Sequence, residues 1–359
     1  MSNTLFDSIR LGSTTAANRV VMAPLTRLRA GTEGVPNELL TTYYTQRASA
    51  GLVVTEGAWP VIEGRTWYGQ PGIETQEQQD AWARVADSVH AEGGLIAMQI
   101  MHGGRISHPE LTGTGRTVGA SPIAPPNPIR ISTGKADSPA PHALTEEEIR
   151  EVIQGFVKAA RRAVDAGMDA VQIHGANGYL LHQFLSPASN QRTDGYGGTP
   201  ANHARLLSEV IRAVAGEIGP ERTGFRLSPQ HNIQGAEELD AEFTKEVYLA
   251  LARNIADLPL HHVDILNADP ASDLIQAIRG EINAPFIANS GFGTQTTREE
   301  AMGLVADGVA DAISVGRPII ANPDLVRRWR EDLPENEPDQ DTFYTEGAAG
   351  YTDYPFYEG

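Results

Sequence analysis

The stretch that decides the fold is residues 145–179, TEEEIREVIQGFVKAARRAVDAGMDAVQIHGANGY. Thr145 followed by Glu148 forms a capping-box pattern, which predicts the start of a helix that extends through residue 166. The apolar run Ala170–Ile173 comes next and predicts a short buried strand, after which polar residues gather. One unit of the chain is therefore a long amphipathic helix followed by a buried strand.

The same alternation continues in both directions from this unit. Seven further strand-like runs are Val20–Ala23, Leu52–Thr55, Leu95–Ile100, Gly224–Leu227, His262–Leu266, Pro285–Ala288 and Asp311–Val315. Other amphipathic stretches are Gln76–Glu92, Pro200–Ile218 and Ala241–Ala256. Continuous apolar strands separated by helices indicate parallel pairing with both sheet faces covered. Eight such units favour an α/β protein with a closed (β/α)8 TIM barrel over an open sheet.

Two segments fall outside this repeat. Residues 101–142 are rich in Gly, Pro, Ser and Thr and too long for a simple loop, so we expect an ordered excursion over the barrel mouth, with a short hairpin. The C-terminal tail, residues 331–359, ends in a group of aromatic residues that should dock onto the barrel.

Pro323 suits the first turn of a closing helix. No interdomain linker stands out, so a single domain over residues 1–359 is expected.

Composition narrows the class of protein. The absence of cysteine excludes disulfides, thiolate metal sites and cysteine nucleophiles. Asp and Glu number 46 against 28 Lys and Arg, a formal charge of −18, which repels nucleic acid and anionic membranes. We see no signal-peptide pattern at the N-terminus and no apolar run near the roughly 20 residues that span a bilayer. The expectation is a cytoplasmic protein, monomeric or homodimeric, that acts on small molecules.

Catalytic groups of such barrels lie at the C-terminal ends of the strands. His174, Asn177 and Tyr179 follow the fourth predicted strand. The histidine and the asparagine could donate hydrogen bonds to one oxygen, and the phenol could supply a proton. Taken alone, His174 is more often a satisfied buried histidine and Tyr179 a packing residue. Their clustering at a strand end favours a site.

A phosphate pocket is indicated after the seventh and eighth strands, where Ser290-Gly291 and Gly316-Arg317 stand. Glycines let backbone N–H groups approach phosphate oxygens, and a guanidinium can bind them bidentately. Two ordinary tight turns are the alternative interpretation. No G-x-G-x-x-G follows a strand and opens a helix, so a Rossmann dinucleotide domain is not expected.

Other barrel chemistries fit the strand ends less well. Schiff-base chemistry would need a lysine there, and a retaining glycosidase would need two carboxylates, where only Glu56 qualifies. The histidines show neither H-x-H nor H-E-x-x-H spacing, so no metal site is expected. A metal-dependent hydrolase or lyase nevertheless stays open as a second hypothesis.

Several stretches carry a resemblance to a known family. They are NRVVMAPLTR at 18–27, HGANGYL at 174–180, SNQRTD at 189–194 leading to YGG at 196–198, RLSP at 226–229, GR at 316–317, NPDL at 322–325 and GYTDYP at 350–355. In this order and spacing, the chain resembles the Old Yellow Enzyme family of FMN-dependent ene-reductases over nearly its whole length.

The resemblance implies bound FMN, with NADPH or NADH as the hydride donor. It implies contacts to the flavin ring from Pro24, Leu25, Thr26, Gly57, Gln99 and Arg226, and to its phosphate from Ser290, Gly291, Gly316 and Arg317. Arg226 would lie where negative charge gathers on the reduced flavin, which favours that state.

The resemblance also implies the reaction, which is reduction of the C=C bond of α,β-unsaturated carbonyls, imides and nitroalkenes. His174 and Asn177 would polarise the substrate oxygen and bind phenols, and Tyr179 would protonate the α-carbon. The pocket wall would comprise Trp67, Met101, Ile233, Gln234, Phe343 and Tyr344. The family commonly has tryptophan where Met101 stands, so we expect a roomier pocket with altered facial selectivity. A flavoprotein that binds ligands without turnover is a third hypothesis.

Overall fold

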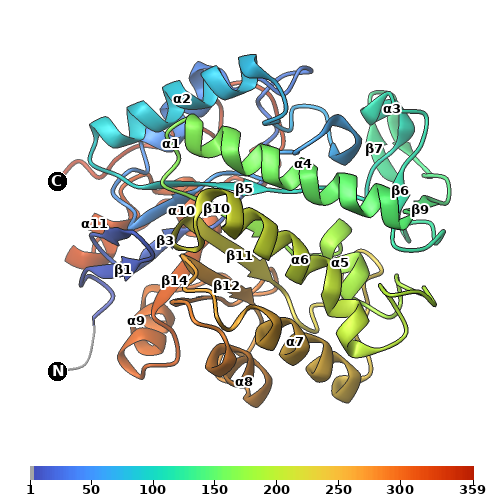
Figure 1. Ribbon diagram of the computed structural model, residues 1–359. Coiled ribbons are helices and arrows are strands. Elements are labelled where there is room, and N and C mark those ends of the chain that lie inside the picture. Colours follow the sequence, from blue (N-terminus) through green and yellow to red (C-terminus); the bar gives the residue numbers. More distant parts are fainter. Residues whose placement is uncertain (1–3) are drawn as a thin grey trace.

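The computed structural model describes residues 4–359 (Figure 1). Residues 1–3 of the predicted 1–359 unit lie outside this range. Eight parallel strands close into a barrel, in which β14 pairs with β3. In barrel order they are β3 Val20–Met22, β4 Leu52–Val54, β5 Ile96–Ile100, β10 Ala170–His174, β11 Thr223–Leu227, β12 His262–Leu266, β13 Phe286–Asn289 and β14 Ala312–Val315. Each matches a predicted run to within one residue at either end, so the predicted (β/α)8 barrel is confirmed.

Helices surround the barrel (Figure 1). They are α1 Glu38–Thr45, α2 Gln76–Ala91, α4 Glu146–Asp165, α5 Leu180–Leu185, α6 Pro200–Ile218, α7 Ala241–Ile255, α8 Asp273–Glu281, α9 Arg298–Ala306, α10 Arg317–Ala321 and α11 Leu325–Glu331. The predicted capping box is present at α4, with Glu148 N donating to Thr145 Oγ1 at 3.2 Å and Thr145 N donating to Glu148 Oε2 at 2.8 Å. The placement of Pro323 was wrong, because α11 begins at Leu325 with Asp324 at its N-cap position, which leaves the proline before the helix.

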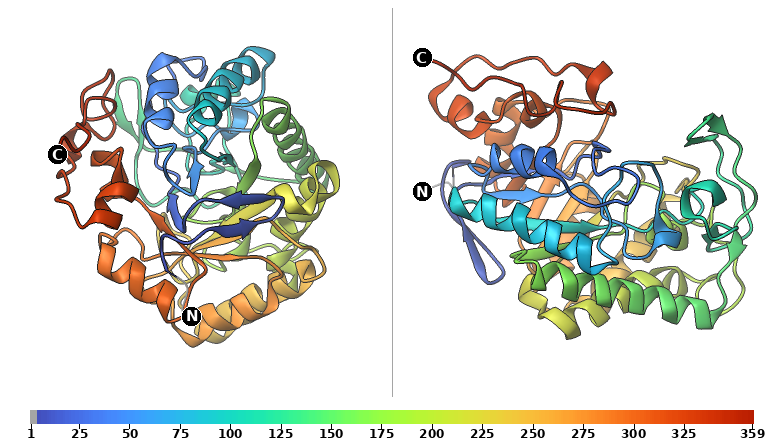
Figure 2. Two further views of the ribbon diagram at one scale, coloured as in Figure 1. Left: turned by 90° about the vertical axis from the view of Figure 1, so that its left-hand side faces the viewer. Right: turned by 90° about the horizontal axis from the view of Figure 1, so that it is seen from above.

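The barrel interior divides into an apolar base and a polar upper half. The base consists of Val21, Leu52, Val54, Ala97, Ala170, Ile287 and Ala312. A hairpin of β1 (Ile9–Leu11) and β2 (Thr14–Ala16) packs its apolar side chains against them and lies across the strands in Figure 2, left. Side chains on successive strand positions alternate between the barrel interior and the helices. The interior positions beyond this base are polar: Gln99, Gln172, His174, Arg226, His262 and Asp264.

The excursion after β5 forms its own small elements at one edge of the molecule (Figure 1). These are α3 Pro109–Thr112, β6 Val118–Gly119 paired with β9 His142–Ala143, and the hairpin of β7 Ile129–Ile131 and β8 Gly134–Ala136. The predicted hairpin is therefore present. Ile129 packs with Met101 and Tyr179, so the excursion buries residues that follow the barrel strands.

The C-terminal tail docks mainly through one aromatic ring and its backbone. Tyr351 is buried and stacks on Tyr43 of α1, with 4.0 Å between ring centroids. Arg27 Nη2 donates to the carbonyl of Gly350 at 2.7 Å. Phe343, Tyr354 and Tyr357 of the tail are partly buried, whereas Tyr344 is 56% exposed and Phe356 48%. Across residues 4–359, every helix is too short or too polar to span a membrane.

Candidate active site

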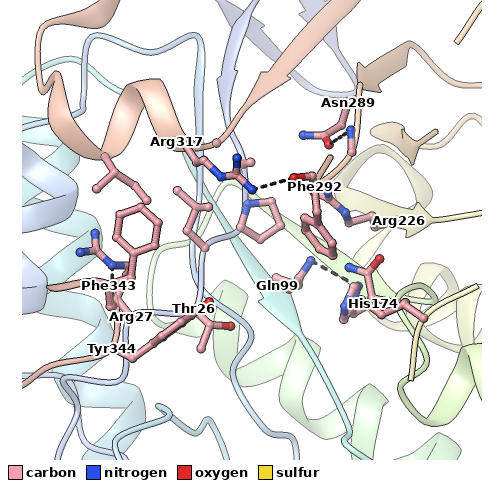
Figure 3. Close-up of a pocket in the computed structure, with 18 of the residues that line it drawn as sticks. Thr26, Arg27, Gln99, His174, Arg226, Asn289, Phe292, Arg317, Phe343 and Tyr344 are labelled. Atoms are coloured by element: carbon pink, nitrogen blue, oxygen red, sulfur yellow. Dashed lines mark hydrogen bonds between the residues drawn. The ribbon is translucent and has the colours of Figure 1, made fainter. Parts of the chain in front are cut away.

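A cavity of about 700 Å³ opens at the C-terminal ends of the strands (Figure 3). Its walls come from the segments that follow β3, β4, β5, β10, β11, β13 and β14, and from the C-terminal tail. All residues predicted to be catalytic or substrate-binding line it: His174, Asn177, Tyr179, Trp67, Met101, Ile233, Gln234, Phe343 and Tyr344. The predicted cofactor-binding residues that line it are Pro24, Leu25, Thr26, Gln99, Arg226, Gly291, Gly316 and Arg317.

Two predicted cofactor-binding residues, Gly57 and Ser290, do not line the cavity. Gly57 lies behind it, where a Cβ atom would come within 2.9 Å of Met101 Cβ and 3.3 Å of Gln99 Oε1. Glycine therefore lets these two side chains occupy their positions. The hydroxyl of Ser290 donates to the Glu300 carboxylate in α9. A direct flavin contact from either residue stays a prediction.

The turn between β10 and α5 is held from two sides. Asn177 adopts the left-handed conformation at φ 57°, which asparagine tolerates better than most residues, and Gly178 follows at φ 79°. The N–H of Asn177 donates to Ser228 Oγ at 2.8 Å, and its carbonyl accepts from Gln234 Nε2 at 2.6 Å. These bonds fix the turn, so that Asn177 borders the same cavity as His174 at the strand end.

His174 and Tyr179 lie side by side, with 5.1 Å between ring centroids. Burial, the nearby Arg226 guanidinium and His182 hold the pKa of His174 well below its usual 6.5. Burial raises the pKa of Tyr179 above its usual 10.0. At neutral pH the imidazole is therefore uncharged and the phenol keeps its proton. Both groups can act as neutral hydrogen-bond donors.

Arg226 supplies a buried cation. Its Nη1 lies 2.9 Å from Oδ2 of the buried Asp264 on the next strand. Burial raises the pKa of Asp264, whereas the Arg226 guanidinium beside it lowers that pKa. Nε of Arg226 is buried and has no hydrogen-bond partner within residues 4–359. Since buried donors are normally paired, this nitrogen indicates a site for an electron-rich ligand atom.

A second cation borders the cavity beyond β14. Arg317 Nη2 donates to the carbonyl of Phe292 at 2.6 Å (Figure 3). The loop containing Phe292 is fixed at its start by Asn289, whose Oδ1 accepts from Gly291 N at 3.0 Å. Asn289 Nδ2 also donates to the Ser314 carbonyl at 2.9 Å. Arg226 and Arg317 thus border one cavity of an otherwise acidic chain, and Arg27 and Arg130 are also among its lining residues.

Sequence reasoning missed part of the lining, namely Ala23, Arg27, Leu28, Arg130, Asn289, Phe292, Thr294, Gln295, Thr296, Ile320 and Gln340. Asn289 is the last residue of β13 and Phe292 lies three residues beyond it, so the strand-end rule could have found them. Arg130 comes from the hairpin of the excursion and Gln340 from the tail. Nothing in their local sequence signals that they reach the cavity.

The cavity fits a flavin. Apolar side chains of Ala23, Pro24 and Leu25 form one wall, and Arg226 presents an unpartnered buried donor. Arg317 offers a separate cation for a phosphate. The lining side chains in the described chain include no carboxylate, and no group of metal-ligating side chains was found among residues 4–359. Fold and site together define a flavin-dependent barrel oxidoreductase.

The comparisons with known proteins identify the family. The model of the NADH:flavin oxidoreductase / NADH oxidase family matches residues 4–336. The chain is 39% identical to a probable flavin mononucleotide-dependent alkene reductase of Leishmania infantum, over 96% of this chain and 95% of the relative. This protein therefore belongs to the NADH:flavin oxidoreductase family, that of the Old Yellow Enzyme.

Solved structures of similar proteins belong to the same family. The Old Yellow Enzyme homologue from Zymomonas mobilis superposes with a TM-score of 0.93 and 40% identity, covering 98% of this chain and 99% of that one. Morphinone reductase in complex with tetrahydroNAD gives 0.92 and 37%, covering 99% and 98%. The predicted family, fold and enzyme class are confirmed.

Proposed function

We propose that this enzyme reduces the C=C bond of α,β-unsaturated carbonyls, imides and nitroalkenes, with NADPH or NADH as the electron source and FMN as the bound cofactor. The observation that carries the proposal is a neutral imidazole, an amide and a protonated phenol side by side on one wall: His174, Asn177 and Tyr179. The likeness to an alkene reductase supports it.

Bound FMN would supply the hydride for the β-carbon of the substrate. The chain's own contribution begins with the substrate oxygen, which His174 and Asn177 would hold by donating two hydrogen bonds. Such donors stabilise the negative charge that gathers on the oxygen as hydride arrives, and one of them is typically worth ~3 kcal/mol. The oxygen of a phenol can accept the same two hydrogen bonds, so phenols should bind to His174 and Asn177 as well.

Tyr179 would complete the reaction by passing its phenol proton to the α-carbon. Its raised pKa keeps the proton on the oxygen until a strongly basic carbon needs it. The ring is buried and meets Trp67 edge-on, with 6.0 Å between centroids. This packing limits water around the phenol, so that the α-carbon of the substrate is the nearest proton acceptor.

The cofactor contacts are part of the proposal. Pro24, Leu25 and Thr26 would lie along the flavin ring, Gln99 and Arg226 would bind its polar edge, and Gly316 and Arg317 its phosphate. The buried Arg226 cation would favour the extra negative charge of the reduced cofactor. We propose that Gly57 contributes to the contacts with the flavin ring, and that Ser290 and Gly291 contribute to those with its phosphate.

NADPH is proposed as the preferred donor. Arg130 lines the cavity from the exposed hairpin of the excursion, and Lys135 lies on the facing strand of that hairpin. A cation on the cavity wall, with a second one opposite it on the facing strand, suits the additional phosphate that distinguishes NADPH from NADH. Comparing the rate of flavin reduction by the two nucleotides tests this preference.

The decisive experiment is an anaerobic visible spectrum of the purified, FMN-loaded protein, first with NADPH and then with 2-cyclohexenone. We expect the yellow colour to bleach and then to return when the enone is added. Bleaching without recovery on any activated alkene would favour a flavoprotein that binds without turnover. A colourless protein that cannot be reconstituted with FMN would overturn the proposal.

A further inference from the structure

Polar side chains form a continuous row through the barrel interior beneath the cavity. Gln172 on β10 lies in register with Gln99 on β5 and with Gly224 on β11. Gly224 in turn lies in register with His262 on β12. All of these residues are completely or almost completely buried. Nothing in the proposed mechanism uses Gln172 or His262.

Hydrogen bonds join this row from the base of the barrel to the cavity. Oγ1 of Thr14, in the basal hairpin, lies 3.4 Å from Nε2 of His261. The Nδ1 atoms of His261 and His262 lie 2.7 Å apart. His262 Nε2 lies 2.9 Å from Gln172 Nε2. Gln99 Nε2 lies 2.8 Å from Gln172 Oε1 and 3.5 Å from His174 Nδ1, the contact drawn as a dashed line in Figure 3.

The donors and acceptors of this row are consistent in one direction only. The amide nitrogen of Gln99 carries two hydrogens, which face Gln172 Oε1 and His174 Nδ1. Nδ1 of His174 therefore accepts. A neutral imidazole has a single N–H, so that proton must be on Nε2. This is the tautomer that can donate from Nε2 to a substrate oxygen.

The contacts in the middle of the row and at its base agree on this direction. Gln172 turns its NH2 group toward His262 Nε2 and its oxygen toward Gln99 Nε2. At the base, the Thr14 hydroxyl donates to the Leu11 carbonyl at 2.9 Å and must accept from the histidine above it. Reversing the row would leave these groups mismatched.

A glycine makes the row possible. A Cβ atom at position 224 would come within 2.3 Å of His262 Cε1 and 2.4 Å of its Nδ1. Gly224 lies on β11, between β10 and β12 in the barrel order. Because it has no side chain, the His262 ring has room to reach across β11 to Gln172.

We propose that Gln172 and His262 are positioning residues, which hold His174 through Gln99 in the tautomer that carries its proton on Nε2. The role rests on the proposed function of His174 as an oxygen-binding donor. It requires uncharged histidines along the row, which burial provides: the pKa of His261 is lowered to about 4 and that of His262 lies well below 6.5. One tautomer then presents the donor to every substrate without rearrangement.

The first test is long-range ¹H–¹⁵N NMR of the FMN-loaded enzyme labelled at its histidines, which distinguishes protonated from unprotonated ring nitrogens. The row predicts protons on Nε2 of His174, on Nδ1 of His262 and on Nε2 of His261. Signals are assigned by single-histidine variants. A proton on Nδ1 of His174 would overturn the proposal with no need for any variant in the row to fold.

The second test compares two substitutions at one position. Gln172→Leu releases Gln99, so His174 should show averaged ¹⁵N shifts, and 4-chlorophenol should bind about two- to tenfold more weakly, as the competent fraction falls. Gln172→Glu, buried and therefore a neutral acid, still accepts from Gln99 and still donates to His262, so it should restore the wild-type His174 signal and affinity. Unchanged shifts and affinity in Gln172→Leu would overturn the relay.

The NMR pattern also separates this inference from the proposed function. An enzyme that fails to reduce enones but shows the predicted tautomers would refute the function and leave the row intact. Full enone reduction by an enzyme whose His174 exchanges freely between its two tautomers would support the function and refute the role of the row.

Discussion

Tyr179 and His174 occupy adjacent places in the cavity but serve different steps in the proposed reaction. Tyr179→Phe removes the phenol proton and leaves the ring packing in place. We expect reoxidation of the reduced enzyme by 2-cyclohexenone to slow by about 10²- to 10⁴-fold, the usual contribution of a positioned proton donor. Reduction by NADPH should be unchanged. Stopped-flow absorbance resolves both half-reactions, and equal damage to both would exclude a proton-donor role.

Met101 determines the room beside this ring. Its side chain is buried with Tyr179 and Ile129, and its Cβ lies close to the backbone of Gly57. A thioether is flexible, whereas an indole would fill the same wall rigidly. Met101→Trp should therefore change the product enantiomer ratio for bulky enones by roughly threefold or more, about 0.7 kcal/mol between the two binding faces.

Chiral chromatography of products from several bulky enones measures that ratio, with a small enone as the internal control. An unaltered ratio for all of them would mean that Met101 does not set facial selectivity.

At the scale of secondary-structure elements, α5 and α7 anchor the catalytic turn through one carboxylate. Three donors converge on Glu238, from Tyr248 Oη at 2.8 Å, Gln230 N at 2.6 Å and His182 Nε2 at 3.1 Å. His182 Nδ1 accepts from Gly178 N at 2.9 Å, directly within the turn. The turn that carries the site is thus tied to the loop after β11 and to a helix.

Glu238→Gln keeps the shape of this side chain but places an NH2 group against a donor. One buried donor then loses its partner, and the free energy of unfolding should fall by about 1–3 kcal/mol. Urea unfolding measures the loss. The neighbouring Glu237 is exposed, so Glu237→Gln is the matched control and should be close to neutral. Equal stability of the two variants would contradict the anchoring role.

Prediction from sequence succeeded where the signal lies within one element. The β10 strand and the α4 capping box depend on neighbouring residues, and both were found. Pro323 was misplaced because the helix begins two residues later, at Leu325, where Asp324 binds the side chain of Arg328 at 2.7 Å. The Gln172 row was invisible in the sequence, since it depends on the register of four strands. Arg130 was missed because the path of a long excursion is set by tertiary packing.

At the scale of the whole molecule, buried neutral histidines should make stability depend on pH. Burial lowers the pKa of His102 to about 3, against 6.5 for the free side chain. The unfolded chain therefore takes up a proton first as the pH falls. The contribution is fully present above pH 6.5 and is lost toward pH 3, at about 1.4 kcal/mol per pH unit.

His102→Gln removes this titration. Its free energy of unfolding, measured with urea at several pH values between 7 and 4.5, should decline less steeply than that of the wild type. Glu56 and Asp264, whose pKa values burial raises, act in the opposite direction but cancel in the comparison. Parallel curves for the two proteins would show that His102 is not held uncharged.

Arg29 joins the tail to the barrel. It donates to the carbonyl oxygens of Gly347 at 2.9 Å, Thr342 at 2.9 Å and Phe343 at 3.2 Å. Lysine keeps the charge but cannot span several acceptors. Losing two such hydrogen bonds, at about 1 kcal/mol each, should speed native-state cleavage of the tail in Arg29→Lys by roughly tenfold to thirtyfold.

Mass spectrometry of timed thermolysin digests locates and times that cleavage. Arg84→Lys on the exposed side of α2 is the control and should digest like the wild type. If both variants resist equally, the tail is held by Tyr351 rather than by Arg29. The prediction of a single domain, monomeric or homodimeric, stays open to the same digests and to solution mass measurement.

The tail also gives synthesis of this enzyme a fixed order. Phe343 and Tyr344 line the cavity, yet they follow all eight barrel strands in the chain. A ribosome therefore releases the barrel before it releases the residues that finish the cavity wall. The cavity is therefore complete only after the final segment has emerged and docked. A chain that ended before Phe343 would lack this part of the cavity wall.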